Sequence, residues 1–157
     1  RNSNKKASRV ILMEFSMKME SNAEDIFSKL IDFENMPKLL PRQLKKVEII
    51  SKKGNLVLTR ETLVFKTVVK NEITQESSHE IGDKKIKTTI CSGPAKNSVI
   101  KMTLEENGTG SKVLINIDLK LSLKARILLP IVKKAYSSLL TGVLYKIDSL
   151  IIEKKSD

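Results

Sequence analysis

Cysteine, histidine and tryptophan are almost missing from this chain: its 157 residues include one Cys, one His and no Trp. A single cysteine excludes an internal disulfide, and one histidine leaves too few ligands for a zinc site built from Cys and His. The same counts exclude a Ser-His-Asp or Cys-His catalytic set unless it depends on His79. We therefore expect no metal, no cofactor and no catalytic residues of a recognisable kind.

Long apolar runs are also missing. No stretch approaches 18 uninterrupted apolar residues, so a membrane-spanning segment is not expected. No long apolar run of the secretory-signal type follows the basic N-terminus. At 40% hydrophobic residues, the length suits a single globular domain. We expect a cytoplasmic protein with a basic, flexible N-terminus over residues 1–9 and one domain over residues 10–154.

Acidic residues are outnumbered, with 18 Asp and Glu against 29 Lys and Arg, which gives a net charge of +11. Most of the basic residues are lysines, and they are scattered along the whole chain. Two interpretations follow: a generally solvated surface, or a field that attracts an anionic partner such as a ribosome, RNA or a membrane surface. The chain lacks an Arg and aromatic platform for bases, so sequence-specific RNA reading is disfavoured. Specific DNA recognition is not expected either.

Hydrophobic periodicity predicts the N-terminal elements. Residues 10–20 alternate with a period of two, which predicts a half-buried strand. Ser21 and Glu24 then have the spacing of a capping box, which predicts a short amphipathic helix to about Asp32. Residues 33–41 form a second short helical turn, and Pro41 should end it.

Short strands and turns follow as far as about residue 123. The predicted strands lie around Val47 and Ile49 and over residues 56–63, 64–75, 84–91, 98–105 and 112–121. No helix intervenes to allow parallel crossovers, so the sheet should be antiparallel. The last thirty residues change to a helical period, which predicts one long helix over residues 127–153 with Pro130 in its first turn.

Three motifs occur in this order of elements. They are residues 23–37 (AEDIFSKLIDFENMP) with Leu40-Pro41, residues 92–96 (SGPAK) and residues 108–113 (GTGSKV). Together they resemble the polyketide cyclase/dehydrase and lipid-transport family of the START-like, Bet v 1-like (SRPBCC) superfamily. Its branches include coenzyme-Q-binding START proteins and the bacterial ribosome-association toxin. The chain departs at Ala95, where that branch commonly has an aromatic residue, and at Met102, where it often has Trp. Both changes alter a cavity lining, so the resemblance does not extend to a particular ligand.

The resemblance implies an α+β helix-grip fold: a curved antiparallel sheet of about seven strands around a long C-terminal helix, with two short helices after strand 1. It also implies a cavity between sheet and helix, which would be lined by Phe15, Met17, Met19, Phe27, Ile31, Ile100, Met102, Leu104, Tyr136, Leu140 and Leu144. Methionines suit such a lining because the thioether is flexible and polarizable. Taken from periodicity alone, the same residues could simply pack as a filled core.

Polar residues of the strand region are assigned as follows. We expect His79 to be exposed near a turn and Cys91 to be a small buried hydrophobe. Glu61 and Glu72 should both face solvent; a carboxyl that faced inward instead would have a raised pKa and could act as a general acid or base. Tyr136 and Tyr145 are nine residues apart, so they point in opposite directions and Tyr136 should face the sheet, where its hydroxyl could meet a ligand.

Three functions compete on this sequence. The first is binding or transport of a lipid-like or other apolar small molecule, which the missing catalytic set favours. The second is an interaction protein that docks on a ribosome, RNA or an anionic membrane through its lysines, with steeply salt-dependent binding. The third, and least favoured, is a cyclase- or dehydratase-type enzyme in which Tyr136 or a buried Glu moves a proton.

Overall fold

The computed structural model describes residues 11–66 and 70–156, so the predicted basic N-terminus lies outside the described residues. Within these described ranges, seven strands form one antiparallel sheet, and two α-helices and two 3-10 helices accompany it. The strands are β1 (Ile11–Met19), β2 (Leu44–Lys53), β3 (Leu56–Lys66), β4 (Lys70–Gly82), β5 (Lys85–Ile90), β6 (Val99–Asn107) and β7 (Gly110–Leu119). The helical elements are α1 (Ala23–Leu30), η1 (Phe33–Lys38), η2 (Ala125–Leu128) and α2 (Leu129–Lys155).

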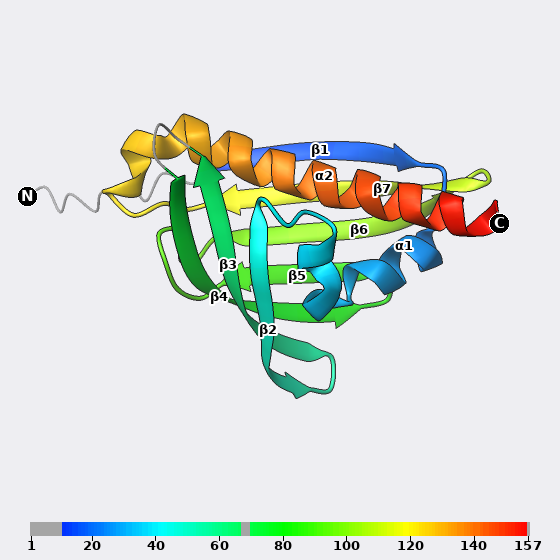
Figure 1. The fold of residues 1–157 in the computed structure, drawn as a ribbon, viewed down its shortest axis with the longest axis horizontal. Helices are drawn as coiled ribbons and strands as arrows, with labels where there is room; N and C mark the ends of the chain where they lie inside the picture. Colours follow the sequence, from blue (N-terminus) through cyan, green and yellow to red (C-terminus); the bar gives the residue numbers. More distant parts are fainter. Residues whose placement is uncertain (1–10, 67–69, 157) are drawn as a thin grey trace, which may run out of the picture.

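The strand order is β1-β7-β6-β5-β4-β3-β2, so the first strand pairs with the last. All other neighbours are consecutive in the chain, as antiparallel hairpins require. The sheet curves around α2, whose first turns lie near the end of β3 and the start of β4 and whose last turns lie near α1 (Figure 1). The predicted helix-grip architecture is confirmed, and the hydrophobic core lies between the concave face of the sheet and the helices.

Helix α2 supplies one wall of that core. It begins two residues later than predicted, because η2 forms the turn before it, and Pro130 lies in its first turn as expected. Its inward face includes Val132, Tyr136 and Leu144, and Tyr145 points outward with 59% of its surface exposed. Among the described residues, one helical segment, Ala125–Lys155, is long and apolar enough to cross a membrane by length and composition alone. In this structure its buried face packs on the sheet.

The cap of α1 differs from the predicted one. Asn22, not Ser21, is the N-cap, and its side-chain oxygen accepts a hydrogen bond from the backbone N–H of Asp25 at 2.9 Å. Ser21 is buried instead, and its N–H donates to Asp148 of α2 at 2.9 Å. The capping pattern could not show this, because the chain offers two adjacent capping residues and a contact 127 residues away decides between them.

The start of β7 closely approaches the end of β1. A Cβ atom at Gly110 would collide with the backbone carbonyl oxygen of Met19, so only glycine fits this position. Beside it, the hydroxyl of Ser111 donates to the carbonyl oxygen of Ser21 at 2.7 Å. These contacts fix the β1–α1 connection against the β6–β7 hairpin.

Two further expectations about the strands are wrong. The boundary predicted between residues 63 and 64 does not exist, because β3 continues to Lys66 and β4 extends to Gly82. No glycine or proline marks the connection between them, so the sequence carried no turn signal there. Cys91, predicted to be buried, is exposed just after β5, where the chain leaves the sheet for the turn at Gly93-Pro94.

Candidate functional site

An inner cavity of about 120 Å³ lies between the concave face and α2. Most of its lining is apolar and comes from the end of α1, from η1, from the middle of α2 and from strands β2 to β6. The apolar lining residues are Leu30, Phe33, Met36, Leu44, Val47, Leu63, Ile86, Ile90, Ile100, Met102, Leu139, Leu140, Val143 and Leu144. One wall differs, because it carries a row of polar side chains.

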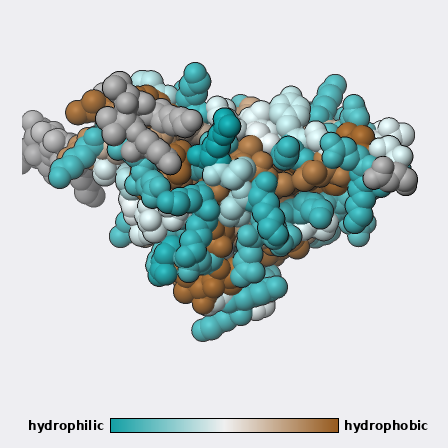
Figure 2. All heavy atoms as spheres, viewed as in Figure 1, coloured by the Kyte–Doolittle hydropathy of each residue, from teal (hydrophilic) through white to brown (hydrophobic). Residues whose placement is uncertain are grey.

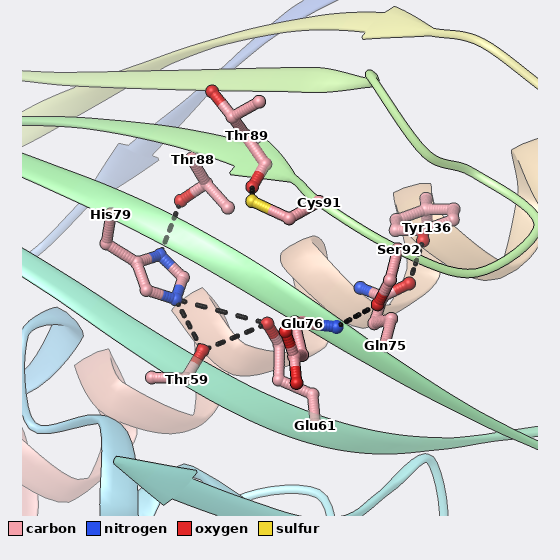
Figure 3. Close-up of polar contacts among 10 residues, drawn as sticks. All are labelled: Thr59, Glu61, Gln75, Glu76, His79, Thr88, Thr89, Cys91, Ser92 and Tyr136. Atoms are coloured by element: carbon pink, nitrogen blue, oxygen red, sulfur yellow. Dashed lines mark hydrogen bonds and ion pairs between the residues drawn. The ribbon is translucent and has the colours of Figure 1, made fainter. Parts of the chain in front are cut away.

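The polar row comes from facing positions of β3, β4 and β5. Thr59 is directly opposite Ser77, Glu61 is opposite Gln75, and His79 is opposite Thr88. Side chains at directly opposite positions of an antiparallel pair share one face of the sheet. This register therefore brings six polar residues together on the concave face, and the Tyr136 hydroxyl of α2 meets them. Figure 3 shows these side chains except that of Ser77.

Hydrogen bonds connect most of this row. His79 Nδ1 lies 2.8 Å from Thr88 Oγ1, and His79 Nε2 lies 2.8 Å from Thr59 Oγ1. Thr59 Oγ1 donates to Glu61 Oε1 at 3.2 Å. The Thr59 hydroxyl has one proton, which it uses in the hydrogen bond to Glu61, so it must accept a hydrogen bond from His79. The His79 proton is therefore assigned to Nε2, and Thr88 donates to Nδ1. Thr88, His79 and Thr59 thus each donate to the next member of a hydrogen-bonded series that ends at the Glu61 carboxylate.

His79 is buried and electrically neutral at pH 7. Its ring stacks on Phe33 of η1 with centroids 4.3 Å apart, and only 7% of the residue is exposed. Burial disfavours the imidazolium and lowers the pKa of His79 to about 4. The expectation that His79 is an exposed turn residue is therefore wrong. Glu61 Oε1 lies 3.9 Å from His79 Nε2, but the neutral ring gives this carboxylate no counter-charge.

Glu61 is a buried carboxyl, and among the described residues no Lys or Arg side chain forms an ion pair with it. Its side chain is 17% exposed, and burial raises its pKa above the usual range. The nearby side chains of Ser77, Thr59 and Gln75 act in the opposite direction, and burial outweighs them. The expectation that Glu61 faces solvent is wrong, whereas Glu72 does face solvent and forms an ion pair with Lys45 at 2.9 Å.

Tyr136 and Ser77 complete the polar row. The Tyr136 hydroxyl donates to Gln75 Oε1 at 3.1 Å, and burial together with the charge of Glu61 raises its pKa. Ser77 is fully buried and lies close enough to Glu61 to lower the pKa of that carboxyl, but within the described residues no polar atom meets its Oγ at proper hydrogen-bond geometry. A buried hydroxyl without a partner is costly. It therefore marks a position where a ligand atom could supply the missing hydrogen bond.

A larger groove of about 690 Å³ adjoins the inner cavity where α2 begins. Leu63, Tyr136 and Leu139 line both spaces, and Arg42 and Lys134 lie at the groove. A drug-sized ligand usually occupies about 300–1,000 Å³. The inner cavity is too small for one, but the groove has the required volume and opens to the surface. We call it the entrance groove.

The predicted site residues divide into two groups. Ile100, Met102, Tyr136, Leu140 and Leu144 line the inner cavity. The others belong to the core or pack against it: Phe15, Met17, Met19, Phe27, Ile31 and Leu104. Helix α1 packs on β6, β7 and α2, and so fills the end of the concave face where several of these residues lie. As ligand contacts, all eleven remain predictions.

The polar row is the part of the site that the sequence did not reveal. Residues 74–80 of β4 (TQESSHE) are all polar, so alternation could not show which of them face inward. The alternation of Thr59, Glu61 and Leu63 in β3 was the one available signal, because Leu63 shares a face with both polar residues. Among the described residues, no group of three or more His, Cys, Asp and Glu side chains could hold a metal ion.

A curved antiparallel sheet around a long C-terminal helix, with an apolar cavity between them, defines the helix-grip class of START-like and Bet v 1-like proteins. A family model described as polyketide cyclase / dehydrase and lipid transport matches residues 19–145. The chain belongs to this family. No curated protein sequence matches the chain significantly.

Solved structures share the fold at low sequence identity. The Zhui aromatase/cyclase from Streptomyces sp. R1128 is 12% identical with a TM-score of 0.77, over 91% of this chain and 96% of that one. A START superfamily protein from Mycobacterium smegmatis is 15% identical with a TM-score of 0.73, over 90% and 97%. A Thalictrum norcoclaurine synthase point mutant in complex with a transition-state analogue is 16% identical with a TM-score of 0.74, over 95% and 98%.

Proposed function

We propose that the protein binds an apolar small molecule that carries uncharged oxygen groups along one side. Its body would occupy the entrance groove and its tip the inner cavity, against the polar row. The observation that carries this proposal is the unpartnered Ser77 hydroxyl beside Glu61 in an otherwise apolar cavity. Membership of a family described by lipid transport and polyketide cyclisation supports a ligand of this kind.

The chemistry of the row favours a neutral ligand group. His79 is uncharged at pH 7, and the raised pKa of Glu61 favours its neutral form. An isolated ion is expensive to bury without a partner of opposite charge. Hydroxyl or carbonyl oxygens, in contrast, can exchange hydrogen bonds with Ser77, Tyr136 and Gln75 at little cost. Hydrocarbon without such oxygens would leave the Ser77 hydroxyl unpaired.

A blocked groove should weaken this binding. Leu139 is half-buried and lines both spaces, so Leu139→Trp places an indole between them. We expect its affinity for the neutral fluorescent probe N-phenyl-1-naphthylamine to fall by about tenfold or more, equivalent to about 1.4 kcal/mol. The control Leu150→Trp changes an exposed leucine of the same helix that lines neither space, and should bind like the unmodified protein.

Fluorescence titration measures both affinities, and native mass spectrometry of the freshly purified protein gives the stoichiometry. Circular dichroism checks that both variants are folded. A protein that takes up no probe and carries no apolar molecule after incubation with a lipid extract would contradict the proposal. Equal affinity in the two Trp variants would show that the probe binds elsewhere.

Proton transfer by Glu61 is the second candidate function. The observation that favours it is the burial of the Glu61 carboxyl, which raises its pKa although Thr59 donates a hydrogen bond to it. A carboxyl held neutral near pH 7 can act as a general acid. Two solved structures with a similar fold are an aromatase/cyclase and a norcoclaurine synthase. Their names are a reason to test this chain for an enzymatic function as well.

Infrared spectroscopy tests this second candidate directly. The unmodified protein should show a protonated carboxylic acid band that persists well above the ordinary pKa of glutamate, 4.5. Glu61→Gln should remove that band. The control Glu76→Gln should retain it, because Glu76 does not line the cavity and pairs with Arg60. If no such band persists above pH 5, Glu61 is ionised at neutral pH and cannot serve as the proton donor.

A further inference from the structure

An exposed apolar cluster lies where the chain enters α2. Its four members are Leu123, Ile127, Leu128 and Ile131, which are 64%, 87%, 42% and 39% exposed. They occur within nine residues because η2 directs only Ala125 into the core and turns its other apolar side chains outward. Hydrophobic atoms are visible on the surface at this end of the molecule (Figure 2). We call these four residues the apolar corner. Contiguous exposed apolar patches commonly mark interaction surfaces.

Basic residues are interspersed with the apolar corner and follow it in the sequence. Lys124 and Arg126 lie between Leu123 and Ile127 in the sequence. Lys133 and Lys134 follow on the first turns of α2. Between Asp118 and Asp148 the chain contains six Lys and Arg residues and no acidic residue. None of the ion pairs formed within residues 11–66 and 70–156 uses these four basic side chains. Their charge is therefore available to an anionic partner.

The apolar corner also adjoins the entrance groove. Ile131 and Lys134 line that groove together with Arg42 and Pro130. A partner that covers the corner would thus lie beside the opening through which a molecule reaches the inner cavity. The surface itself exists whether or not the cavity binds a ligand, so an inference about the corner does not depend on the proposed function.

We propose that the apolar corner docks on the surface of an anionic lipid bilayer. Ile127 and Leu123 would enter the boundary between headgroups and acyl chains, and the neighbouring Lys and Arg would remain among the lipid phosphates. Electrostatic attraction to anionic lipid adds to the burial of apolar surface in this arrangement. RNA offers the same charge but no apolar phase, and would leave a side chain as exposed as Ile127 unused. The combination therefore favours a bilayer.

The missing tryptophan makes the insertion directly measurable. Because the chain has no Trp, Ile127→Trp introduces a single fluorescent reporter at the corner. The control Tyr145→Trp places the same reporter at an exposed position of α2. It lies sixteen residues, or about 24 Å, beyond the start of that helix. With vesicles of phosphatidylcholine containing roughly 30 mol% phosphatidylserine, we expect a blue shift at position 127 and none at position 145.

Two substitution sets separate the apolar and the electrostatic contributions in vesicle co-sedimentation. Ile127→Ser should weaken binding by about tenfold, because it removes the most exposed apolar side chain. The pair Lys133→Gln and Lys134→Gln should weaken binding by about fivefold for each charge removed. The control pair Lys52→Gln and Lys53→Gln lies on the β2–β3 hairpin, removes the same charge and should have a much smaller effect.

Each alternative outcome would overturn the proposal. The absence of a blue shift at low salt would show that the corner does not enter the bilayer. Equal losses in the Lys133/Lys134 and Lys52/Lys53 variants would indicate general attraction of a basic protein instead of a docking face. Binding to a model RNA that matches vesicle binding and ignores Ile127→Ser would identify a polyanion partner in place of the membrane.

Discussion

Replacing Asp148 by alanine is expected to lower the free energy of unfolding by about 2–6 kcal/mol. Asp148 is 8% exposed, and its two carboxylate oxygens accept hydrogen bonds from the backbone N–H groups of Glu20 and Ser21 at 3.0 and 2.9 Å. Alanine would leave both donors without their partner in a largely buried place. Each unsatisfied group costs about 1–3 kcal/mol, which gives the expected range.

The effect should be large because this carboxylate connects distant parts of the chain. Asp148 lies on α2, whereas its partners lie at the end of β1, 127 and 128 residues earlier. Nearby, Glu106 of β6 accepts a hydrogen bond from the N–H of Ala23 at 3.1 Å, so the first turn of α1 is also held by a carboxylate. The junction closes the end of the concave face away from the entrance groove.

Urea unfolding measures the loss, with Asp148→Asn and Ser149→Ala as comparisons. The asparagine keeps one acceptor oxygen and should cost less than alanine. Ser149 is exposed on the next position of the helix, so its replacement should change stability by no more than about 0.5 kcal/mol. If Asp148→Ala and Ser149→Ala are equally stable, the carboxylate does not hold this junction.

Local patterns in the sequence were sufficient for the elements and the architecture. The alternation in residues 10–20, the helical period after residue 127 and the position of Pro130 each agree with the structure to within a few residues. The opposite directions of Tyr136 and Tyr145 followed from helical geometry alone and are confirmed. These features depend on contacts between near neighbours in the chain, and local sequence reports such contacts.

The polar row of the cavity could not be predicted in the same way. Whether His79 faces inward depends on the register of β4 against β3 and β5, and a shift by one residue would turn it to solvent. An all-polar stretch such as residues 74–80 gives no apolar face to fix that register from the sequence. The inward direction of Thr59, Glu61 and Gln75 likewise depends on the register between β3 and β4. The prediction that Cys91 is buried is wrong because cysteine is commonly buried as a residue type, whereas this one lies just beyond the end of β5.

The buried position of His79 should make the protein less stable in mild acid. The pKa of His79 is about 4 in the folded protein and 6.5 as the ordinary value. Between these values the unfolded chain binds more protons than the folded protein, so stability falls as the pH falls through this range. At 1.36 kcal/mol per unit of difference in pKa, the loss amounts to roughly 3 kcal/mol when the pH reaches 4.

Glu61 acts in the opposite direction and must be separated from this effect. Its pKa is raised, so the folded protein retains a proton that the unfolded chain releases, and stability falls as the pH rises above the ordinary value of 4.5. Unmodified protein therefore shows the sum of two opposed slopes. Comparison with His79→Gln at each pH isolates the histidine, because the amide can replace the ring's hydrogen bonds to Thr59 and Thr88 without taking up a proton.

Urea unfolding between pH 4 and pH 7.5 gives the difference in stability between the two proteins, which should shift by about 2–3 kcal/mol in favour of His79→Gln as the pH falls. Because the chain has one histidine, its imidazole proton resonance can be followed without assignment. That resonance should remain unchanged from pH 7.5 to 5.5 in the folded protein and titrate near 4. A midpoint near 6.5 would mean that the ring is solvated, and a solvated ring could not belong to the closed donor chain that leads to Glu61.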